Sequence, residues 1–394
     1  MSTEFFDRKL AQTTPFPFGL EIASAKGIWL QDVHGKKYMD LISGVGVSGI
    51  GHGHPKVIEA IKAQADKYLH VMVYGEYLQA PQTALAQKLT AILPNHLDCC
   101  YFVNSGAEGI EAALKLAKRA TGRTRIVSAR GAYHGSTHGA MSVSGNEAKK
   151  KAFRPLLPDV HFIKYNHLSA LEAITDQTAC ILLETVQGDA GVRIPDAAWL
   201  QAVRRKCDET GCLLILDEIQ AGIGRTGAHF AFQHFGITPD ILVLGKALGA
   251  GMPIGACIAN QSLMELFTRD PMLGHITTFG GHPLVCAAAA AGLDVLTEEI
   301  QMEHVNKIGA YLAQRLRGHS RVQEVRQIGL FFAIDMESAE VVQQVVDFGL
   351  KYGFIGFWFL SCPYSFRIAP PLNMTMKEAE QACDVIISAF DALS

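Results

Sequence analysis

Uninterrupted apolar runs of strand length lie in the middle of the chain, at residues 180–183, 213–216 and 241–244. Runs that do not alternate with polar residues are typical of strands covered on both faces, as in parallel sheets. Further strand-like segments and intervening helical segments extend this pattern. The strand-like segments are residues 100–103, 125–128 and 160–163, and the helical segments are residues 80–93, 108–119 and 197–210. The alternation predicts an α/β fold with a central, mainly parallel sheet.

The two ends of the chain have a different pattern. Residues 28–42 predict two short strands around an Asp-x-x-Gly turn. The elements expected after Pro283 are a long helical stretch to about residue 318, strands at 330–336 and 366–369, and helices at 341–352 and 377–393. We expect residues 1–50 and 297–394 to form a smaller α+β domain around a large α/β domain at residues 51–296.

Composition narrows the class of protein. Of the 394 residues, 49% are hydrophobic and only 19% are charged, which excludes an intrinsically disordered chain. The formal net charge of −3 argues against a nucleic acid or an anionic membrane surface as a partner. The longest apolar run, residues 284–296, is interrupted by Asp294 and is too short to span a bilayer.

The cysteines and the N-terminal segment indicate the compartment. The nine cysteines are odd in number and form no Cys-x-x-Cys pair, so we expect neither a disulfide framework nor a zinc ribbon. The segment MSTEFFDRKLAQTTPFPF lacks the apolar region of a secretory signal. We therefore expect reduced thiols and a cytoplasmic protein.

Residues that could take part in binding or catalysis follow four of the expected strands. In an open α/β sheet, ligands bind beyond the carboxyl ends of the strands, so these residues are expected to meet at one edge. They are Ser105, Gly106 and Ala107 after residues 100–103, Glu184 and Asp217 after two of the apolar runs, and Lys246 after the third.

Each of these groups has an ordinary structural alternative. The helix start at Ser105 exposes amides that suit a phosphate, but serine is also a common helix N-cap. Lys246 lies in an apolar, glycine-rich setting that suits Schiff-base chemistry, but it could equally extend to the surface. Asp217 needs a cationic partner, which could be a structural salt bridge. Together, an anion cradle, an amine and a carboxylate fit pyridoxal phosphate, which needs all three.

An ordered series of motifs carries a family resemblance over nearly the whole chain. The motifs are GIWLQDVHGKKYMDLISGVGVSGIGHGHP, FVNSGAEGIEAALKLAKRATGR, ARGAYHGSTHGAMSVSG, LLETVQGDAGV, LLILDEIQAGIGRTG, LGKALGAGMPIGA, TTFGGHPLVCAAA and RIAPPL. With this series the sequence resembles the class III (ω-amino-acid) aminotransferases, which have fold type I of the pyridoxal-phosphate enzymes. The resemblance implies an obligate homodimer and pyridoxal 5'-phosphate as the cofactor.

The resemblance also implies cofactor contacts. Lys246 would bind the cofactor covalently and carry a proton during catalysis, and Asp217 would keep the pyridine nitrogen protonated. The other contacts would come from Ser105, Gly106 and Ala107 at the phosphate, Gln220 at the phenolic oxygen, Tyr133 on one ring face with His134 beside it, Glu184 at the same edge, and Thr278 of the second subunit at the phosphate.

Three residues would contact the substrate. Arg367 would hold a substrate carboxylate, for which its planar guanidinium is suited. In the family, a glutamate in a QGE motif pairs with this arginine and swings away. Here the motif reads Gln187-Gly188-Asp189, so the charge is on a side chain one methylene shorter. Val45 stands where ornithine aminotransferases have a tyrosine and where 4-aminobutyrate aminotransferases are apolar.

We therefore predict an aminotransferase that moves an amino group from an ω-amino acid of the ornithine, acetylornithine or 4-aminobutyrate type to a 2-oxo acid. The expected acceptor is 2-oxoglutarate, in a ping-pong reaction. A decarboxylase, aminomutase or racemase of the same fold would share Lys246 and Asp217, so the motifs leave these reactions open. A non-enzymatic protein of this fold is a third hypothesis. We expect no metal site, because His134 and His138 have no third ligand.

Overall fold

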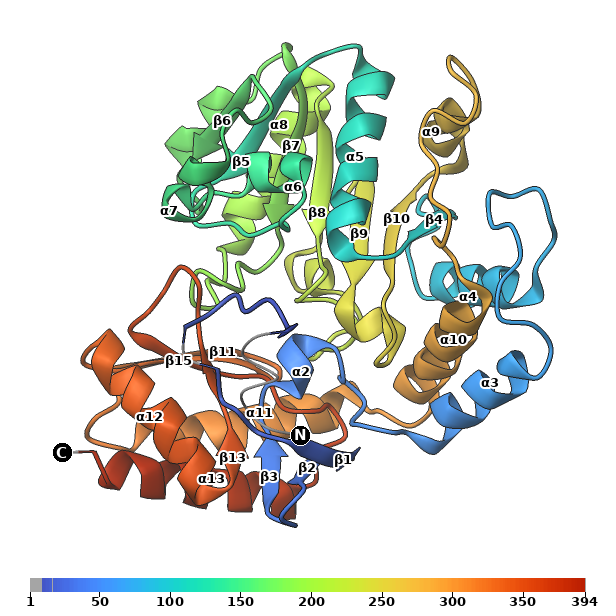
Figure 1. Cartoon of the computed structure of the whole chain (residues 1–394). Helices are drawn as coiled ribbons and strands as arrows, with labels where there is room; N and C mark the ends of the chain where they lie inside the picture. Colours follow the sequence, from blue (N-terminus) through green and yellow to red (C-terminus); the bar gives the residue numbers. More distant parts are fainter. Residues whose placement is uncertain (1–8, 16, 394) are drawn as a thin grey trace.

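A seven-stranded sheet forms the centre of the computed structural model, which describes residues 9–15 and 17–393 (Figure 1). Its strands are β4 (Cys99–Val103), β5 (Arg125–Ala129), β6 (Val160–Ile163), β7 (Thr178–Glu184), β8 (Leu213–Asp217), β9 (Ile241–Gly245) and β10 (Gly255–Ala259). Their order is β4-β10-β9-β8-β7-β5-β6. The strands from β9 to β6 run parallel, whereas β10 is antiparallel to β9 and β4. The sheet is mainly parallel, as predicted.

Helices cover both faces of this sheet, which explains the uninterrupted apolar runs. On one face, Leu182 belongs to the same buried cluster as residues of α5 (Gly106–Thr121). On the other face, Ile181 belongs to the cluster that includes residues of α8 (Ala197–Thr210). Neighbouring side chains on a strand point to opposite faces, so a strand between two helical layers must be apolar at every position.

Two four-stranded sheets lie beside the central sheet, in the lower part of Figure 1. One has the order β1-β2-β3-β13 and joins both ends of the chain, and the other has the antiparallel order β11-β12-β15-β14. Their strands are β1 (Ile22–Lys26), β2 (Trp29–Asp32), β3 (Lys37–Asp40), β11 (Glu324–Ile328), β12 (Phe331–Asp335), β13 (Phe354–Ile355), β14 (Phe357–Trp358) and β15 (Ser365–Ile368). The domain boundaries near residues 50 and 297 stay a prediction.

The prediction of one long helix after Pro283 is wrong, because the structure has two helices there. α10 (Pro283–Glu298) packs on α3 (Pro55–Ala65) and α4 (Ala80–Ala91), whereas α11 (Met302–Arg317) packs on α13 (Met376–Asp391). A straight helix could not reach both sets of partners, and the chain turns through an extended Gln301 between them. Among the residues described, no helix is long and apolar enough to cross a membrane.

The other helical elements are short, apart from one. They are α2 (Ser43–Gly46), α6 (His138–Val143), α7 (Glu147–Lys150), α9 (Gln261–Met264), the longer α12 (Ala339–Tyr352), and the 3-10 turns η1 (Lys151–Phe153), η2 (Leu168–Ala173), η3 (Ala231–Phe235), η4 (Lys246–Gly249) and η5 (Glu265–Thr268). In Figure 1, α2 lies between the central sheet and the two smaller sheets.

Candidate active site

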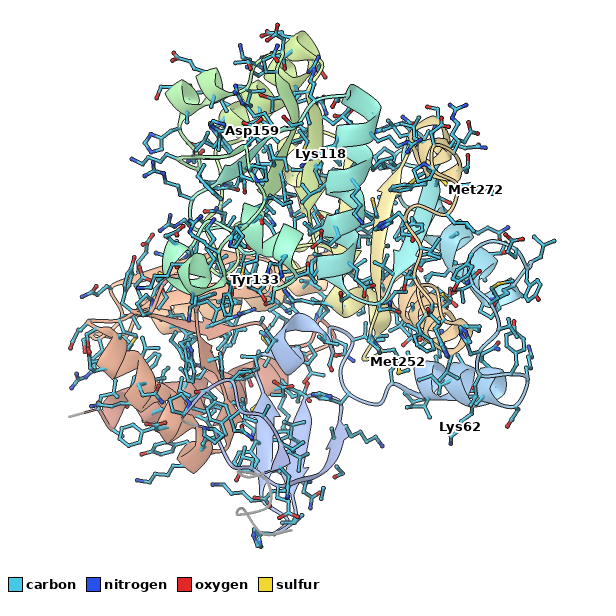
Figure 2. All side chains as sticks on the ribbon, turned by 45° about the horizontal axis from the view of Figure 1, so that its top comes forward. Lys62, Lys118, Tyr133, Asp159, Met252 and Met272 are labelled. Atoms are coloured by element: carbon cyan, nitrogen blue, oxygen red, sulfur yellow. The ribbon has the colours of Figure 1, made fainter. Side chains whose placement is uncertain are left out.

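The carboxyl ends of β7, β8 and β9 meet at one edge of the central sheet. Glu184 ends β7 and is paired in register with Asp217, which ends β8, and Lys246 directly follows β9. These three residues line a cavity of about 310 Å³. The other lining residues are Gly106, Ala107, Tyr133, His134, Gly135, Ser136, Val186, Ile219, Gln220 and Ala221. Figure 2 shows Tyr133 where the central α/β layer faces the smaller sheets.

Lys246 lies in this cavity and in a strained backbone conformation. Its φ of 46° is in the left-handed region, which residues with a Cβ rarely adopt. Its Nζ donates to Gln220 Oε1 at 3.5 Å. Burial lowers the pKa of the Lys246 ammonium group, and the nearby charge of Asp189 opposes part of that shift. A lysine with a lowered pKa is a better nucleophile near neutral pH.

Asp217 is paired with a histidine. His134 Nδ1 donates to Asp217 Oδ2 at 2.7 Å, and both side chains are almost fully buried. The N–H of Ile219 donates to Asp217 Oδ1 at 3.0 Å, which fixes the plane of the carboxylate. The backbone N–H of His134 donates to Ser144 Oγ at 3.0 Å. The sequence placed His134 beside Tyr133 but did not predict its contact with Asp217.

Glu184 is a buried carboxylate held by backbone amides. It accepts the N–H of Tyr133 at 3.3 Å and the N–H of Gly188 at 3.1 Å. Burial raises the pKa of Glu184 well above its ordinary value, and the charges of Asp217 and Asp189 raise it further. The side chain therefore ties together two loops that line or flank the cavity.

At the start of α5, Ser105 has the structural role of an N-cap, and its contact with a phosphate stays a prediction. Ser105 Oγ accepts the N–H of Glu108 at 3.2 Å, so Ser105 is the helix N-cap. Gly106 and Ala107 line the cavity, and first-turn amides have no carbonyl partner within their helix. A Cβ on Gly106 would lie 2.6 Å from Ile219 Cδ1, so a larger residue there would displace the Ile219 side chain.

Tyr133 and Gln220 offer polar atoms at the cavity. The Tyr133 hydroxyl lies 3.2 Å from Ser136 Oγ, and 37% of the tyrosine is exposed, which is more than a core aromatic residue would show. Gln220 Nε2 is buried and has no hydrogen-bond partner. An unpaired buried amide is costly unless a ligand satisfies it.

Arg367 and Asp189 form a buried ion pair. Arg367 Nη1 donates to Asp189 Oδ1 at 3.2 Å, and the two side chains are only 5% and 7% exposed. Arg367 Nε and Nη2 have no partner. Burial lowers the pKa of Arg367, while the charge of Asp189 opposes that shift. The shorter aspartate therefore makes direct contact with the arginine.

Five of the predicted residues do not line this cavity, namely Ser105, Asp189, Arg367, Val45 and Thr278. Val45, on α2, is 40% exposed and has a φ of 65°. Thr278 is exposed in the segment that leads to α10. Neither lines the cavity of this single chain.

The model of the aminotransferase class-III family matches residues 11–390 of the chain. The chain belongs to the class III aminotransferases. The resemblance seen in the sequence is thereby confirmed, and the protein is a pyridoxal-phosphate-dependent transaminase.

Named relatives of this class III aminotransferase differ in their substrates. The chain is 39% identical over 376 residues to the acetylornithine aminotransferase of Methanosarcina mazei, across 94% of this chain and 91% of that protein. It is 38% identical over 407 residues to the putrescine aminotransferase of Pectobacterium atrosepticum, across 99% of this chain and 86% of that protein. The ornithine aminotransferase of Toxoplasma gondii has a similar structure, with a TM-score of 0.92, 30% identity, and coverage of 100% and 96%.

The cavity of this class III aminotransferase suits the family's cofactor. The first-turn amides of Gly106 and Ala107 would suit a phosphate, Lys246 would suit an aldehyde, and Asp217 would suit a protonated ring nitrogen. The unpaired Gln220 Nε2 would gain a partner from a ring oxygen. These residues fit pyridoxal phosphate, although the contacts themselves stay a proposal.

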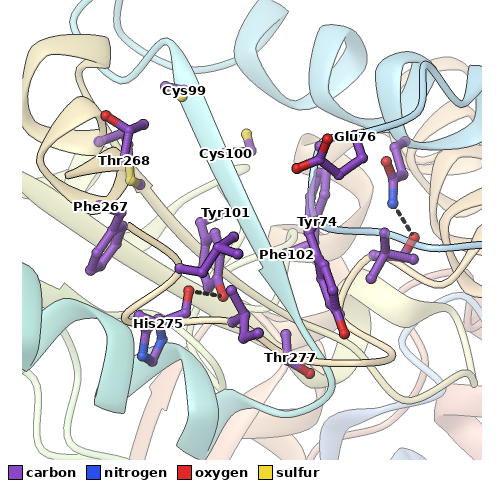
Figure 3. Close-up of a pocket in the computed structure, with 18 of the residues that line it drawn as sticks. Tyr74, Glu76, Cys99, Cys100, Tyr101, Phe102, Phe267, Thr268, His275 and Thr277 are labelled. Carbon is purple, nitrogen blue, oxygen red and sulfur yellow. Dashed lines mark hydrogen bonds between the residues drawn. The ribbon is translucent and has the colours of Figure 1, made fainter. Parts of the chain in front are cut away.

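A second hollow was not predicted from the sequence. It has a volume of about 610 Å³ and lies over β4, the edge strand of the central sheet (Figure 3). Apolar residues on its rim are well exposed, including Tyr74, Met272, Leu273 and Ile276. Exposed apolar residues gathered around a hollow are typical of surfaces that contact a protein, a membrane or a ligand.

Proposed function

We propose that this transaminase takes an amino group from an ω-amino acid and transfers it to a 2-oxo acid in a ping-pong reaction. The proposed donors are of the ornithine, acetylornithine or 4-aminobutyrate type, and the proposed acceptor is 2-oxoglutarate. The buried Arg367–Asp189 pair carries the proposal. The charges of both residues influence the pKa of Lys246, which supports a position of the pair close to the reactive amine.

Arg367 would bind the carboxylate of the 2-oxo acid that accepts the amino group. A guanidinium with two unpaired N–H donor atoms can form a bidentate contact once a substrate carboxylate arrives. Asp189 would mask this charge when the reacting amine lies far from the carboxylate, and would release it for 2-oxoglutarate. The substrates named for the relatives include a diamine and acetylated and free ornithine, which supports a donor with an amine at the end of a carbon chain.

The cavity residues would divide the chemistry between them. When bound, pyridoxal phosphate supplies an electron-withdrawing ring that makes the proton on the amine-bearing carbon labile. Lys246 Nζ would remove that proton and pass it to the cofactor carbon that carried the aldehyde. Asp217, oriented by His134, would hold a proton at the ring nitrogen. Tyr133 would cover one face of the ring and limit the access of water.

We infer that the enzyme is a homodimer with shared active sites. The apolar hollow over β4 offers a surface of the kind that a stable interface needs. Thr278 lies at the surface, outside its own cavity, which supports a contact with the partner's cofactor phosphate. All nine cysteines are free, which supports the proposal of a reducing, cytoplasmic location.

An amino-donor screen tests the reaction. Ornithine, acetylornithine, 4-aminobutyrate and lysine are each incubated with 2-oxoglutarate, and glutamate formation is measured against consumption of the oxo acid. We expect one donor to give stoichiometric transfer. When both substrates are varied, double-reciprocal plots of the initial rate should give parallel lines, as a ping-pong reaction requires. Turnover of a donor without consumption of the oxo acid would instead indicate a decarboxylase, aminomutase or racemase.

Two variants serve as controls. Lys246→Ala should abolish transfer and remove the visible absorbance band of the bound cofactor. Arg367→Ala should raise KM for carboxylate substrates by at least tenfold and leave KM for simple amines nearly unchanged, because about 1.5–3 kcal/mol of charged hydrogen bonding is lost. Equal effects on both substrate classes would contradict the carboxylate clamp.

A further inference from the structure

Arg225 is a buried arginine that donates to backbone carbonyls. It lies in the loop that follows β8, beyond Gln220, and is only 3% exposed. Its Nη1 donates to the carbonyl oxygen of Leu330 at 2.9 Å and to that of Pro370 at 2.6 Å. Its Nη2 is buried and has no hydrogen-bond partner. A carbonyl carries no full negative charge, so these contacts compensate the buried guanidinium less well than a carboxylate would.

The two carbonyls belong to the ends of neighbouring strands in the sheet that carries Arg367. Leu330 directly precedes β12, and Pro370 follows shortly after the end of β15. These strands are antiparallel, and Ala333 of β12 is paired with Arg367 of β15. One nitrogen of Arg225 therefore holds the start of β12 and the segment after β15 together, close along the chain to the proposed carboxylate clamp.

Backbone contacts at the same place make the junction tight. The N–H of Leu330 donates to the carbonyl oxygen of Arg225 at 3.0 Å, so the two residues are bonded in both directions. A Cβ on Gly329 would lie 2.3 Å from the carbonyl carbon of Thr226 and 2.4 Å from the backbone nitrogen of Gly227. A residue with a Cβ would not let two backbone segments approach so closely. The loop of Arg225 is thus fixed against the turn between β11 and β12.

The other end of this loop is part of the cofactor cavity. The loop begins after Asp217, which ends β8, and it includes Gln220, which lines the cavity. The N–H of Arg225 donates to the carbonyl oxygen of Gly222 at 3.3 Å, so the stretch between is a short, hydrogen-bonded turn. Burial lowers the pKa of Arg225 to about 9, and the charge of Arg367 contributes to this shift, which supports a position of the two guanidinium groups near each other.

We propose that Arg225 is a positioning residue for the carboxylate clamp, because its guanidinium fixes the end of β15, and with it Arg367, relative to the cofactor cavity. Arg225 does not line the cavity, so it acts through Arg367 and not on the substrate. For stability alone, an apolar side chain often serves as well as a buried charge. The arginine instead sets the distance between Arg367 and Lys246 that a 2-oxo acid must match. This inference rests on the proposed function, because it needs Arg367 to bind the carboxylate of the 2-oxo acid.

Steady-state kinetics test this role. In a ping-pong reaction, kcat/KM for each substrate reports on its own half of the reaction, so 2-oxoglutarate is compared with an amine donor that has no carboxylate, such as putrescine. Arg225→Met removes both hydrogen bonds and keeps an unbranched side chain. It should lower kcat/KM for 2-oxoglutarate by about tenfold and change kcat/KM for the amine donor by less than about twofold, because a misplaced binding group affects only the substrate that uses it.

Two further variants control for structure. Arg225→Lys keeps the charge and a donor and should recover part of the loss, and it replaces Arg225→Met, with a smaller expected fall, if that variant does not fold. Arg123→Met is the matched control, because Arg123 Nη1 likewise donates to two carbonyls, those of Thr178 and Thr210, each at 3.0 Å. Thr178 begins β7, at the opposite end from Glu184. Arg123→Met should therefore lower Tm and leave both kcat/KM values unchanged.

A double-mutant cycle separates positioning from a general loss of structure. Arg225→Met/Arg367→Ala should have the same kcat/KM for 2-oxoglutarate as Arg367→Ala alone, because the clamp that Arg225 positions is already gone. The absorbance band of the bound cofactor should be unchanged in the Arg225 variants. Additive losses, or equal falls for 2-oxoglutarate and the amine donor, would overturn the inference.

The same measurements distinguish this inference from the proposed function. If Arg367→Ala leaves kcat/KM for 2-oxoglutarate unchanged, the proposed carboxylate clamp fails, and the inference fails with it. If Arg367→Ala lowers that value and Arg225→Met does not, the clamp stands and only the positioning role of Arg225 is overturned.

Discussion

Removing Asp189 leaves a buried arginine without its counter-charge. Arg367 is 5% exposed, and its Nε and Nη2 already have no hydrogen-bond partner, so the ion pair with Asp189 supplies most of its compensation. Breaking such a buried pair by truncating one side typically costs about 3–5 kcal/mol. Asp189→Ala should therefore be clearly less stable than wild type.

The size of the effect follows from the chain length. A 394-residue chain has an entropy of unfolding of roughly 0.8 kcal/mol per kelvin near its Tm. The loss should therefore lower Tm by about 4–6 °C, measured by calorimetry of the cofactor-loaded enzyme at a fixed scan rate. Asp189→Glu keeps the charge and is the matched control, for which we expect a smaller change.

A double variant separates the pair from the loop that carries it. In Asp189→Ala/Arg367→Met the unpaired charge is gone and an apolar side chain fills the space, so Tm should recover most of the loss. A single variant as stable as wild type would refute the argument, and so would a double variant no better than the single one. In activity assays, Asp189→Ala should lower KM for 2-oxoglutarate, because Arg367 no longer has a competing carboxylate.

Three further predictions concern the residues around the cofactor cavity. His134→Phe removes the 2.7 Å donor to Asp217 and should weaken cofactor binding about tenfold in an absorbance titration, whereas His134→Asn can still donate and should retain most of the affinity. Gly106→Ala places a Cβ 2.6 Å from Ile219 Cδ1 and should reduce cofactor retention after dialysis, and Ile219→Ala in the same chain should restore it. Burial raises the pKa of Glu218 to about 7 from its ordinary value of 4.5, so the folded state favours the protonated form. The stability that Glu218 contributes is thus present below about pH 4.5 and is lost as the pH rises through 7, by roughly 3 kcal/mol. Urea unfolding across this pH range should show that the free energy of unfolding falls more steeply with pH in wild type than in Glu218→Gln. An equal dependence on pH in the two proteins would contradict the prediction.

The sequence alone determined the parallel part of the central sheet and the position of its reactive edge. The apolar runs at 180–183, 213–216 and 241–244 are parallel strands because helices cover both faces, and that burial demands apolar residues at every position. Glu184, Asp217 and Lys246 meet because parallel strands end at the same edge. The local pattern of apolar residues and the parallel direction of the strands were sufficient to predict this part of the site.

Other elements could not be predicted because their pattern is weak. β10 has the sequence GACIA, whose small residues give little strand signal, and it runs antiparallel between two strands that are far apart in the chain. The break between α10 and α11 depends on their different packing partners. In both cases the tertiary contacts, rather than local propensity, select the structure.

Only the tertiary structure decided how the site residues are paired. Asp189 and Arg367 are 178 positions apart, and they meet because a tight turn at Gly188 places the shorter carboxylate against β15. His134 is 83 positions from Asp217, and no spacing rule connects them. Residues 43–46 look like a flexible glycine-rich loop in the sequence, but the buried carboxylate of Asp40 holds them in a left-handed turn. The sequence names the chemical groups, whereas long-range hydrogen bonds and burial decide which of them touch.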